Sequence, residues 1–249
     1  MSTDRNRRSE QVGLRERAER AAATLGSELT LVAGTPLAVW RHLRRSTPVH
    51  RYEFRTPKVQ LPPHANEPGD DAVQVPDDGV GSSYRRRYHL RLRGSRLGAR
   101  ELVDMVAGDP NLVCPTEVAN FERNQESLEQ ADGLQEGEEL LVRVAGPWNG
   151  PVRVVERTPT SFRLQTLKGH MEAGQIEFRA RDGEEDGCLV FEIESHARSG
   201  TKLFGALYDR GIGRRAQEHM WISFLDQVAR QAGAEVVGGI HVETERSFE

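Results

Sequence analysis

His170 and Glu172 are the residues whose types and spacing come closest to a catalytic pair. They lie in residues 166–178, TLKGHMEAGQIEF. An imidazole exchanges protons near neutral pH and a nearby carboxylate can orient it, so the pair could serve as a general base. However, Gly169 and Gly174 bracket the pair, and such glycines are typical of a turn between strands. No nucleophile is indicated nearby. We therefore weigh a structural turn first, ligand contact second and catalysis third.

Metal and nucleotide chemistry have little support. The two cysteines, Cys114 and Cys188, form no Cys-x-x-Cys motif, and the eight histidines include no His-x-x-x-His pair, so we expect no metal site. Residues 211–216, GIGRRA, fit the pattern G-x-G-x-x-A. That fingerprint needs a preceding strand, whereas here helical sequence precedes it, which favours a helix break. We expect no cofactor.

Residues 84–94, YRRRYHLRLRG, mix aromatic and basic side chains, a composition found in proteins that bind RNA. The segment alternates as a strand does, with its tyrosines on the same face as two leucines. The tyrosines are therefore predicted to face the core and the basic residues to face water, so we expect no nucleic-acid partner. The face assigned to the core comprises Tyr84, Tyr88, Leu90 and Leu92; the basic face comprises Arg85, Arg87, His89, Arg91 and Arg93.

The rest of the chain indicates one domain with extensions. A helical segment (97–113) follows the first strand, several short alternating segments between 138 and 198 predict an antiparallel meander, and 202–231 is helical with a break at Gly211 and Gly213. The predicted units are an N-terminal helical extension (1–58), a linker rich in Pro, Gly and Asp (59–83), the main domain (84–232) and a polar tail (233–249).

A sheet that is hydrophobic on one face must be covered, and the long C-terminal helix is the element available to cover it. This order of elements predicts an α+β fold of the helix-grip (START-like) type. In that arrangement a curved antiparallel sheet wraps around the long C-terminal helix.

The segments from 146 to 180 and from 190 to 200 also resemble a family of bacterial and plant proteins, the domain of unknown function 1990. The resemblance covers roughly residues 36–232 and implies a fold related to START-like domains, but it implies no established activity. In many members a proline follows the histidine and an acid precedes the strand, whereas this chain has Met171 and Gln175 there. The matching positions are Thr166, Leu167, Gly169, His170, Glu172, Gly174, Phe191, Ile193, Ser195 and Arg198.

A half-barrel of this size commonly holds one small ligand. The leading hypothesis is therefore a protein without catalytic activity that binds a small hydrophobic molecule between the sheet and the C-terminal helix. A second hypothesis is a cyclase- or hydratase-type enzyme that uses His170, Glu172 or Glu177 as acid or base, although the strand pattern turns Glu177 away from the core. The predicted ligand-binding residues are Phe162, Leu164, His170, Glu172, Ile176, Phe178, Phe191, Ile193, Tyr208 and Trp221.

A third hypothesis concerns residues 29–45, LTLVAGTPLAVWRHLRR. Its apolar run ends in arginines, so it could contact a membrane surface or a partner. Packing against the main domain is the simpler alternative. No run reaches the roughly 18 apolar residues of a spanning helix, and the N-terminus has no apolar signal-peptide core. We expect a cytoplasmic protein; the sequence leaves its oligomeric state open.

Overall fold

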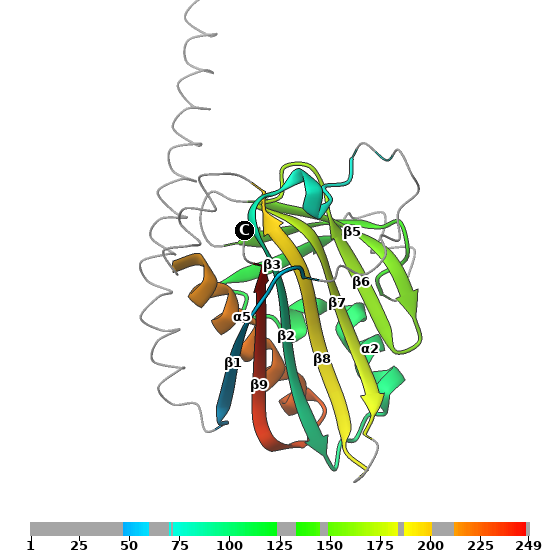
Figure 1. The fold of residues 1–249 in the computed structure, drawn as a ribbon. Helices are drawn as coiled ribbons and strands as arrows, with labels where there is room; N and C mark the ends of the chain where they lie inside the picture. The colour runs from blue at the N-terminus through cyan, green and yellow to red at the C-terminus, as the bar shows by residue number, and fades with distance from the viewer. Residues whose placement is uncertain are drawn as a thin grey trace, which may run out of the picture.

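A mixed sheet of nine strands forms the body of the protein (Figure 1). The computed structural model describes residues 47–59, 70, 72–123, 133–144, 149–183, 187–200 and 212–247. Residues 29–45 and Tyr208 therefore lie outside the described residues. The strands are β1 (Val49–Thr56), β2 (Val80–Arg93), β3 (Ala119–Arg123), β4 (Glu139–Val144), β5 (Asn149–Thr158), β6 (Ser161–Thr166), β7 (Glu172–Asp182), β8 (Leu189–Ser199) and β9 (Glu235–Ser247).

The strands lie in the order β1-β9-β2-β8-β7-β6-β5-β4-β3. Strands β3 to β8 form the expected antiparallel meander. Strand β9 pairs antiparallel with β2 but parallel with β1, so the sheet is mixed rather than wholly antiparallel. Two α-helices, α2 (Ala99–Gly108) and α5 (Ile212–Gln231), accompany the described strands, with two short 3-10 helices, η1 (Pro76–Asp78) and η2 (Pro110–Leu112). The α+β class predicted from the sequence is confirmed.

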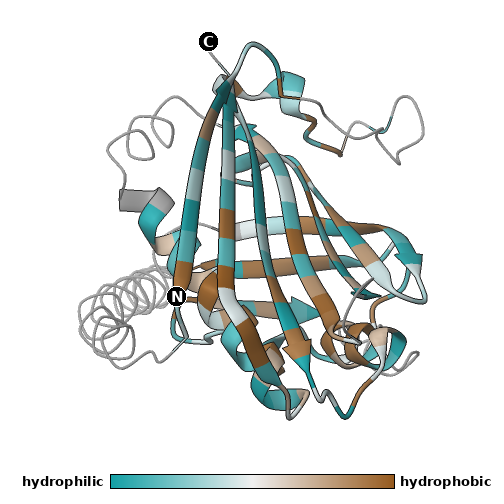
Figure 2. Ribbon diagram, turned by 60° about the horizontal axis from the view of Figure 1, so that its bottom comes forward, coloured by the Kyte–Doolittle hydropathy of each residue, from teal (hydrophilic) through white to brown (hydrophobic). Residues whose placement is uncertain are grey.

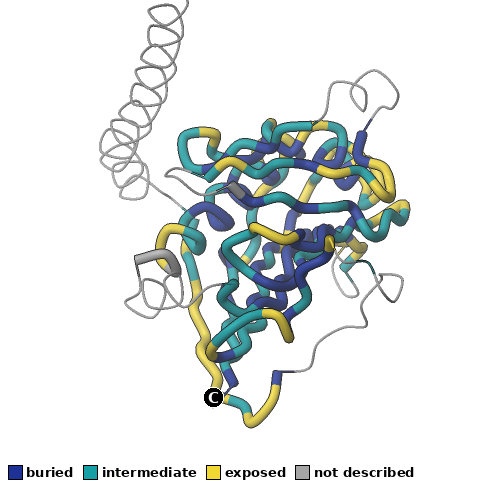
Figure 3. The backbone as a smooth tube through the Cα atoms, turned by 90° about the horizontal axis from the view of Figure 1, so that it is seen from above, coloured by how far each residue is buried: buried dark blue, intermediate teal, exposed yellow. Residues whose placement is uncertain are grey.

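Both α-helices lie on one face of the sheet, which we call the inner face (Figure 1). Hydrophobic and hydrophilic residues alternate along the strands, as the brown and teal segments of Figure 2 show. This alternation directs the apolar side chains to the inner face. Helix α2 contributes Leu102, Val103 and Val106 to the core, and α5 contributes Trp221 and Phe224. The buried segments gather between the sheet and the helices (Figure 3). The sheet is therefore covered on its inner face, as the alternating pattern required.

Two of the predicted chain boundaries are wrong. Residues 235–247, expected within a polar tail, form strand β9 between β1 and β2, and residues 49–56, expected within a helical extension, form β1. Both segments are polar because β1 is exposed on both faces along most of its length and β9 is half-buried at many positions. The Gly238–Gly239 pair also hides the alternation of β9, since the β2–β9 register shifts next to it.

Strand β7 approaches β8 very closely at Gly174. A Cβ added there would lie 2.0 Å from the carbonyl oxygen of His196 and 2.7 Å from the Cα of Ala197. The glycine is therefore explained by this close approach within the sheet, and not by the turn that the sequence suggested.

Gly174→Ala is therefore expected to lower the free energy of unfolding by at least about 2 kcal/mol, because two backbones must separate to admit the methyl group. Gly108→Ala is the control, since a Cβ there meets nothing within 4 Å, and we expect it to change stability by less than about 1 kcal/mol. Urea unfolding of both variants measures the difference. Equal effects of the two substitutions would contradict this account of the β7–β8 contact.

Candidate functional site

The described residues among the predicted ligand-binding set come together on the inner face. Strand pairing places Phe162, Phe178 and Ile193 side by side in one row across β6, β7 and β8. The next row along the strands holds Leu164 and Ile176. Phe191 is fully buried on the same face of β8.

These aromatic side chains contact one another and helix α5. Phe178 lies at the centre: its ring stacks on Phe162 at a centroid distance of 4.7 Å and meets Trp221 and Phe224 at 5.6 Å each. Trp221 and Phe224 are 5.7 Å apart. We call these four residues the aromatic cluster. Its side chains pack together as core, and their contact with a ligand stays a prediction.

The inner face becomes polar in the row next to the aromatic cluster. The main polar residue of this row, Arg86, was not among the predicted site residues. Ile176 pairs with Ser195, which in turn pairs with Arg86 of β2. Arg86 is only 3% exposed. It has the same strand parity as Tyr84 and Tyr88, so alternation along β2 could have predicted an inward arginine among the outward ones.

Arg86 connects the sheet to α5 through a polar network. Its Nη1 donates to Gln217 Oε1 at 3.1 Å, and Gln217 Nε2 donates to Glu172 Oε2 at 3.0 Å. The direct approach of Arg86 to the Glu172 carboxylate is longer, 4.0 Å. The guanidinium also lies 4.6 Å from the centre of the Tyr84 ring. We call Arg86, Gln217 and Glu172 the inner polar cluster.

Trp221 adds a hydrogen-bond donor on the same helix. It follows Gln217 by one helical turn, so both side chains lie on one face of α5. Trp221 is 6% exposed, and its buried Nε1 has no hydrogen-bond partner among the residues that the structure describes. Buried polar groups in proteins are nearly always paired, so an exception of this kind is informative.

The side chain of His170 lies on the inner side of the sheet, next to Gly150 at the start of β5. A Cβ on Gly150 would point inward, as Val152 does, and would lie 2.8 Å from His170 Nε2. The glycine therefore leaves room for the imidazole. His170 Nδ1 lies 2.9 Å from both the backbone nitrogen and the carbonyl oxygen of Glu172, so the backbone of that residue holds the ring in place. Burial lowers the pKa of His170, which favours the neutral form.

The side chains of His170 and Glu172 do not form the catalytic pair considered from the sequence. The imidazole binds the backbone of Glu172, while the carboxylate of Glu172 turns to Gln217. Gln74 holds the same turn by donating to the carbonyl oxygens of His170 and Glu172, each at 3.2 Å. Glu177 faces the opposite side of the sheet with Arg179, and burial raises its pKa.

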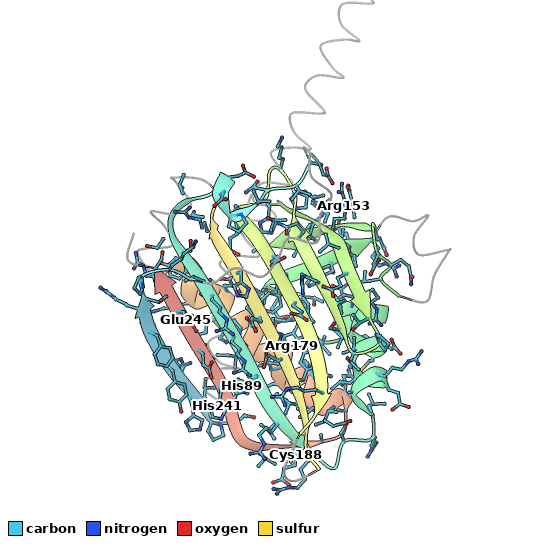
Figure 4. All side chains as sticks on the ribbon, turned by 45° about the vertical axis from the view of Figure 1, so that its right-hand side comes forward. His89, Arg153, Arg179, Cys188, His241 and Glu245 are labelled. Atoms are coloured by element: carbon cyan, nitrogen blue, oxygen red, sulfur yellow. The ribbon has the colours of Figure 1, made fainter. Side chains whose placement is uncertain are left out.

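The opposite, outer face carries rows of compensating charges. Arg85 donates to Glu194 and Glu245, at 2.7 and 2.8 Å. Arg87 lies 2.6 Å from Glu192. Figure 4 shows this face, with Glu245, Arg179, His89 and His241 projecting away from α5. Each strand here supplies charges that its neighbours neutralise, so we attribute a structural role to this face.

Two histidines of the outer face make stability depend on pH. Burial lowers the pKa of His89 to about 4, with help from Arg87, and burial also lowers the pKa of His196 to about 4. In the unfolded chain a histidine titrates near 6.5. Between these values the unfolded state binds more protons than the folded state, so stability falls as pH falls from about 6.5 to about 4.

We expect this loss to be about 1–2 kcal/mol for each histidine, allowing for partial exposure. His89→Gln should flatten the decline of the melting temperature over this pH window. His50→Gln, an exposed histidine on β1, is the control and should leave the slope unchanged. Parallel pH profiles for wild type and His89→Gln would contradict the assignment.

The described residues contain no group of three or more His, Cys, Asp or Glu side chains arranged to hold a metal ion. Among the described helices, none has the length and apolarity needed to cross a membrane. Cys114 and Cys188 are both buried, and burial raises the pKa of the Cys114 thiol to about 12. The candidate site therefore consists of the inner polar cluster together with His170 and Trp221.

Residues 119–226 match the model of a protein family, the domain of unknown function DUF1990. The match confirms the resemblance found in the sequence, over a shorter range than expected. The DUF1990 match includes the turn with His170, the carboxylate of Glu172 and the α5 residues Gln217 and Trp221. Arg86 lies outside it. A comparison with curated proteins gave no significant match.

Comparison with solved structures gave weak likenesses. A hypothetical protein from Helicobacter pylori is 11% identical, with 71% of this chain and 98% of that chain covered and a TM-score of 0.44. Norcoclaurine synthase from Thalictrum flavum, in complex with dopamine and hydroxybenzaldehyde, is 11% identical, with 70% and 98% covered and a TM-score of 0.41. A conserved protein from Geobacillus kaustophilus is 14% identical, with 61% and 98% covered and a TM-score of 0.40. At this level of similarity they assign neither an activity nor a ligand to this chain.

Proposed function

We propose that the protein binds a small molecule between the inner face of the sheet and α5, in a fold of the helix-grip type. The ligand has an apolar body and at least one oxygen that accepts hydrogen bonds. The unpaired, buried Nε1 of Trp221 is the observation that carries this proposal. A buried donor without a partner costs about 1–3 kcal/mol, and a ligand oxygen would remove that cost.

The ligand is placed at the polar end of the inner face. The rings of the aromatic cluster already contact one another, so side chains fill the space between them. The cluster forms one wall of the proposed site. Next to this wall lies the inner polar cluster, in which the buried cation of Arg86 contacts the Gln217 amide and the Tyr84 ring. A mostly apolar wall with a few polar groups is the usual composition of a ligand site. An acidic group on the ligand would be favoured beside Arg86.

An enzyme of the cyclase or hydratase type is the second candidate. The position of the buried His170 ring on the inner side of the sheet, where a Cβ on Gly150 would lie 2.8 Å from its Nε2, favours it. His170 would then donate a proton or a hydrogen bond to a ligand oxygen, and Glu172 would act separately because its carboxylate bonds to Gln217. A membrane or partner contact through residues 29–45 and a cytoplasmic location remain proposals from the sequence.

Two fluorescent probes with the same kind of aromatic body test the binding proposal. Phenylnaphthylamine is neutral, whereas anilinonaphthalene sulfonate adds an acidic group. We expect both probes to bind the folded protein, and the acidic one more tightly. Arg86→Gln should weaken binding of the acidic probe by about tenfold, equivalent to about 1.4 kcal/mol, and should leave the neutral probe nearly unchanged.

Arg85→Gln is the matched control, because Arg85 is the neighbouring arginine on the outer face of the same strand. It should leave both affinities unchanged. Near-ultraviolet circular dichroism of each variant verifies that its side chains are packed. The proposal fails if neither probe binds wild type, or if Arg85→Gln weakens binding as much as Arg86→Gln does.

A further inference from the structure

Strand β1 lies at an edge of the sheet. It pairs only with β9, in a continuous parallel register over its eight residues and without a bulge. Within the described part of the chain, no strand pairs with its other side. Pro48 and Pro57 flank the strand, but its interior contains neither proline nor lysine. Such an edge presents backbone N–H and C=O groups to another strand.

Exposed aromatic side chains concentrate on this strand. The structure describes three exposed large hydrophobic side chains, and two of them, Tyr52 (45% exposed) and Phe54 (52%), lie on β1. Both share the outer face with His50. The patch continues onto β9, where His241 lies 5.1 Å from the His50 ring and 6.2 Å from the Tyr52 ring. Exposed aromatic residues beside an open edge are typical of an interaction surface.

We propose that β1 pairs antiparallel with β1 of a second copy of this chain, with Tyr52 opposite Tyr52. Two copies related by a twofold axis must place residues of the same face opposite each other. This condition leaves few registers. The charges of Arg51, Glu53 and Arg55 choose among them, because these residues share the inner side of the strand.

With Tyr52 at the centre, Arg51 lies opposite Glu53 of the second copy. Because of the twofold symmetry, this attractive pair occurs twice in the dimer. His50 then faces Phe54 of the second copy, also twice. Centring the pairing on Arg51 would oppose two arginines. Centring it on Glu53 would oppose two glutamates and would also place Arg51 against Arg55. Like charges directly opposite each other are destabilising, so these two registers are disfavoured. Centring the pairing on Phe54 would oppose Glu53 and Arg55, but only residues 52–56 of the strand would then pair, whereas the register centred on Tyr52 pairs residues 49–55.

The dimer joins two sheets into one continuous sheet, a form of β-strand addition. A single pair of strands makes a small interface, so we expect a dissociation constant in the micromolar range or weaker. Arg51 also lies 2.6 Å from Glu218 of α5, which is on the inner side of the sheet.

Sedimentation velocity of the full chain over a concentration series tests the proposal. Wild type should associate reversibly to a dimer. Glu53→Arg and Arg51→Glu should each weaken the dimer by about tenfold, because each creates two like-charge pairs. The double variant that carries both reversals should recover most of the wild-type affinity.

Arg55→Glu is the control for register. In the proposed pairing Arg55 faces Val49 of the second copy, so this variant should dimerise as wild type does. In the register centred on Glu53 it would strengthen the dimer instead. The proposal is overturned if wild type stays monomeric throughout the series. It is also overturned if neither single charge reversal changes the dissociation constant, because the dimer would then form through another surface.

Discussion

The packing of α5 onto the inner face of the sheet is the interaction on which the rest of the structure depends. Phe178 meets Phe162 within the sheet and both Trp221 and Phe224 on the helix, so one ring joins the two layers. Strand alternation dictates this contact, because it sends every second side chain of β6, β7 and β8 toward the helix. The same rule sends Arg86 inward, where it binds Gln217 of α5.

Charged side chains have different surroundings on the two faces of the sheet. This difference distinguishes the structural role of the outer face from the candidate functional role of the inner face. On the outer face, Arg85 and Arg87 of β2 each have carboxylates on both neighbouring strands, such as Glu194 and Glu245 around Arg85. On the inner face, Arg86 lies 4.0 Å from the carboxylate of Glu172, and Gln217 donates a hydrogen bond to that carboxylate. The inner face therefore combines a buried cation with the buried indole donor of Trp221, and it is there that we propose a ligand.

Periodicity predicted most of the fold and little of the site. The α+β class, the meander and the C-terminal helix followed from alternating and helical patterns, which depend only on local sequence. Strands β1 and β9 were missed because their pairing is decided by partners far away in the chain, and because Gly238 and Gly239 interrupt the pattern of β9. Arg86 was overlooked among its outward neighbours, although its parity identified it. The side-chain direction of Glu172 depends on Gln217, which the sequence does not place beside it.

The most direct test of the central claim is the indole N–H resonance of Trp221 in a nitrogen–proton correlation spectrum. The chain has three tryptophans, and the signal that disappears in Trp221→Phe identifies this one. Adding anilinonaphthalene sulfonate to saturation should shift this signal in wild type, because an oxygen of the ligand accepts the indole proton. A Trp221 signal that stays in place while the probe is bound would contradict a ligand site at the polar end of the inner face.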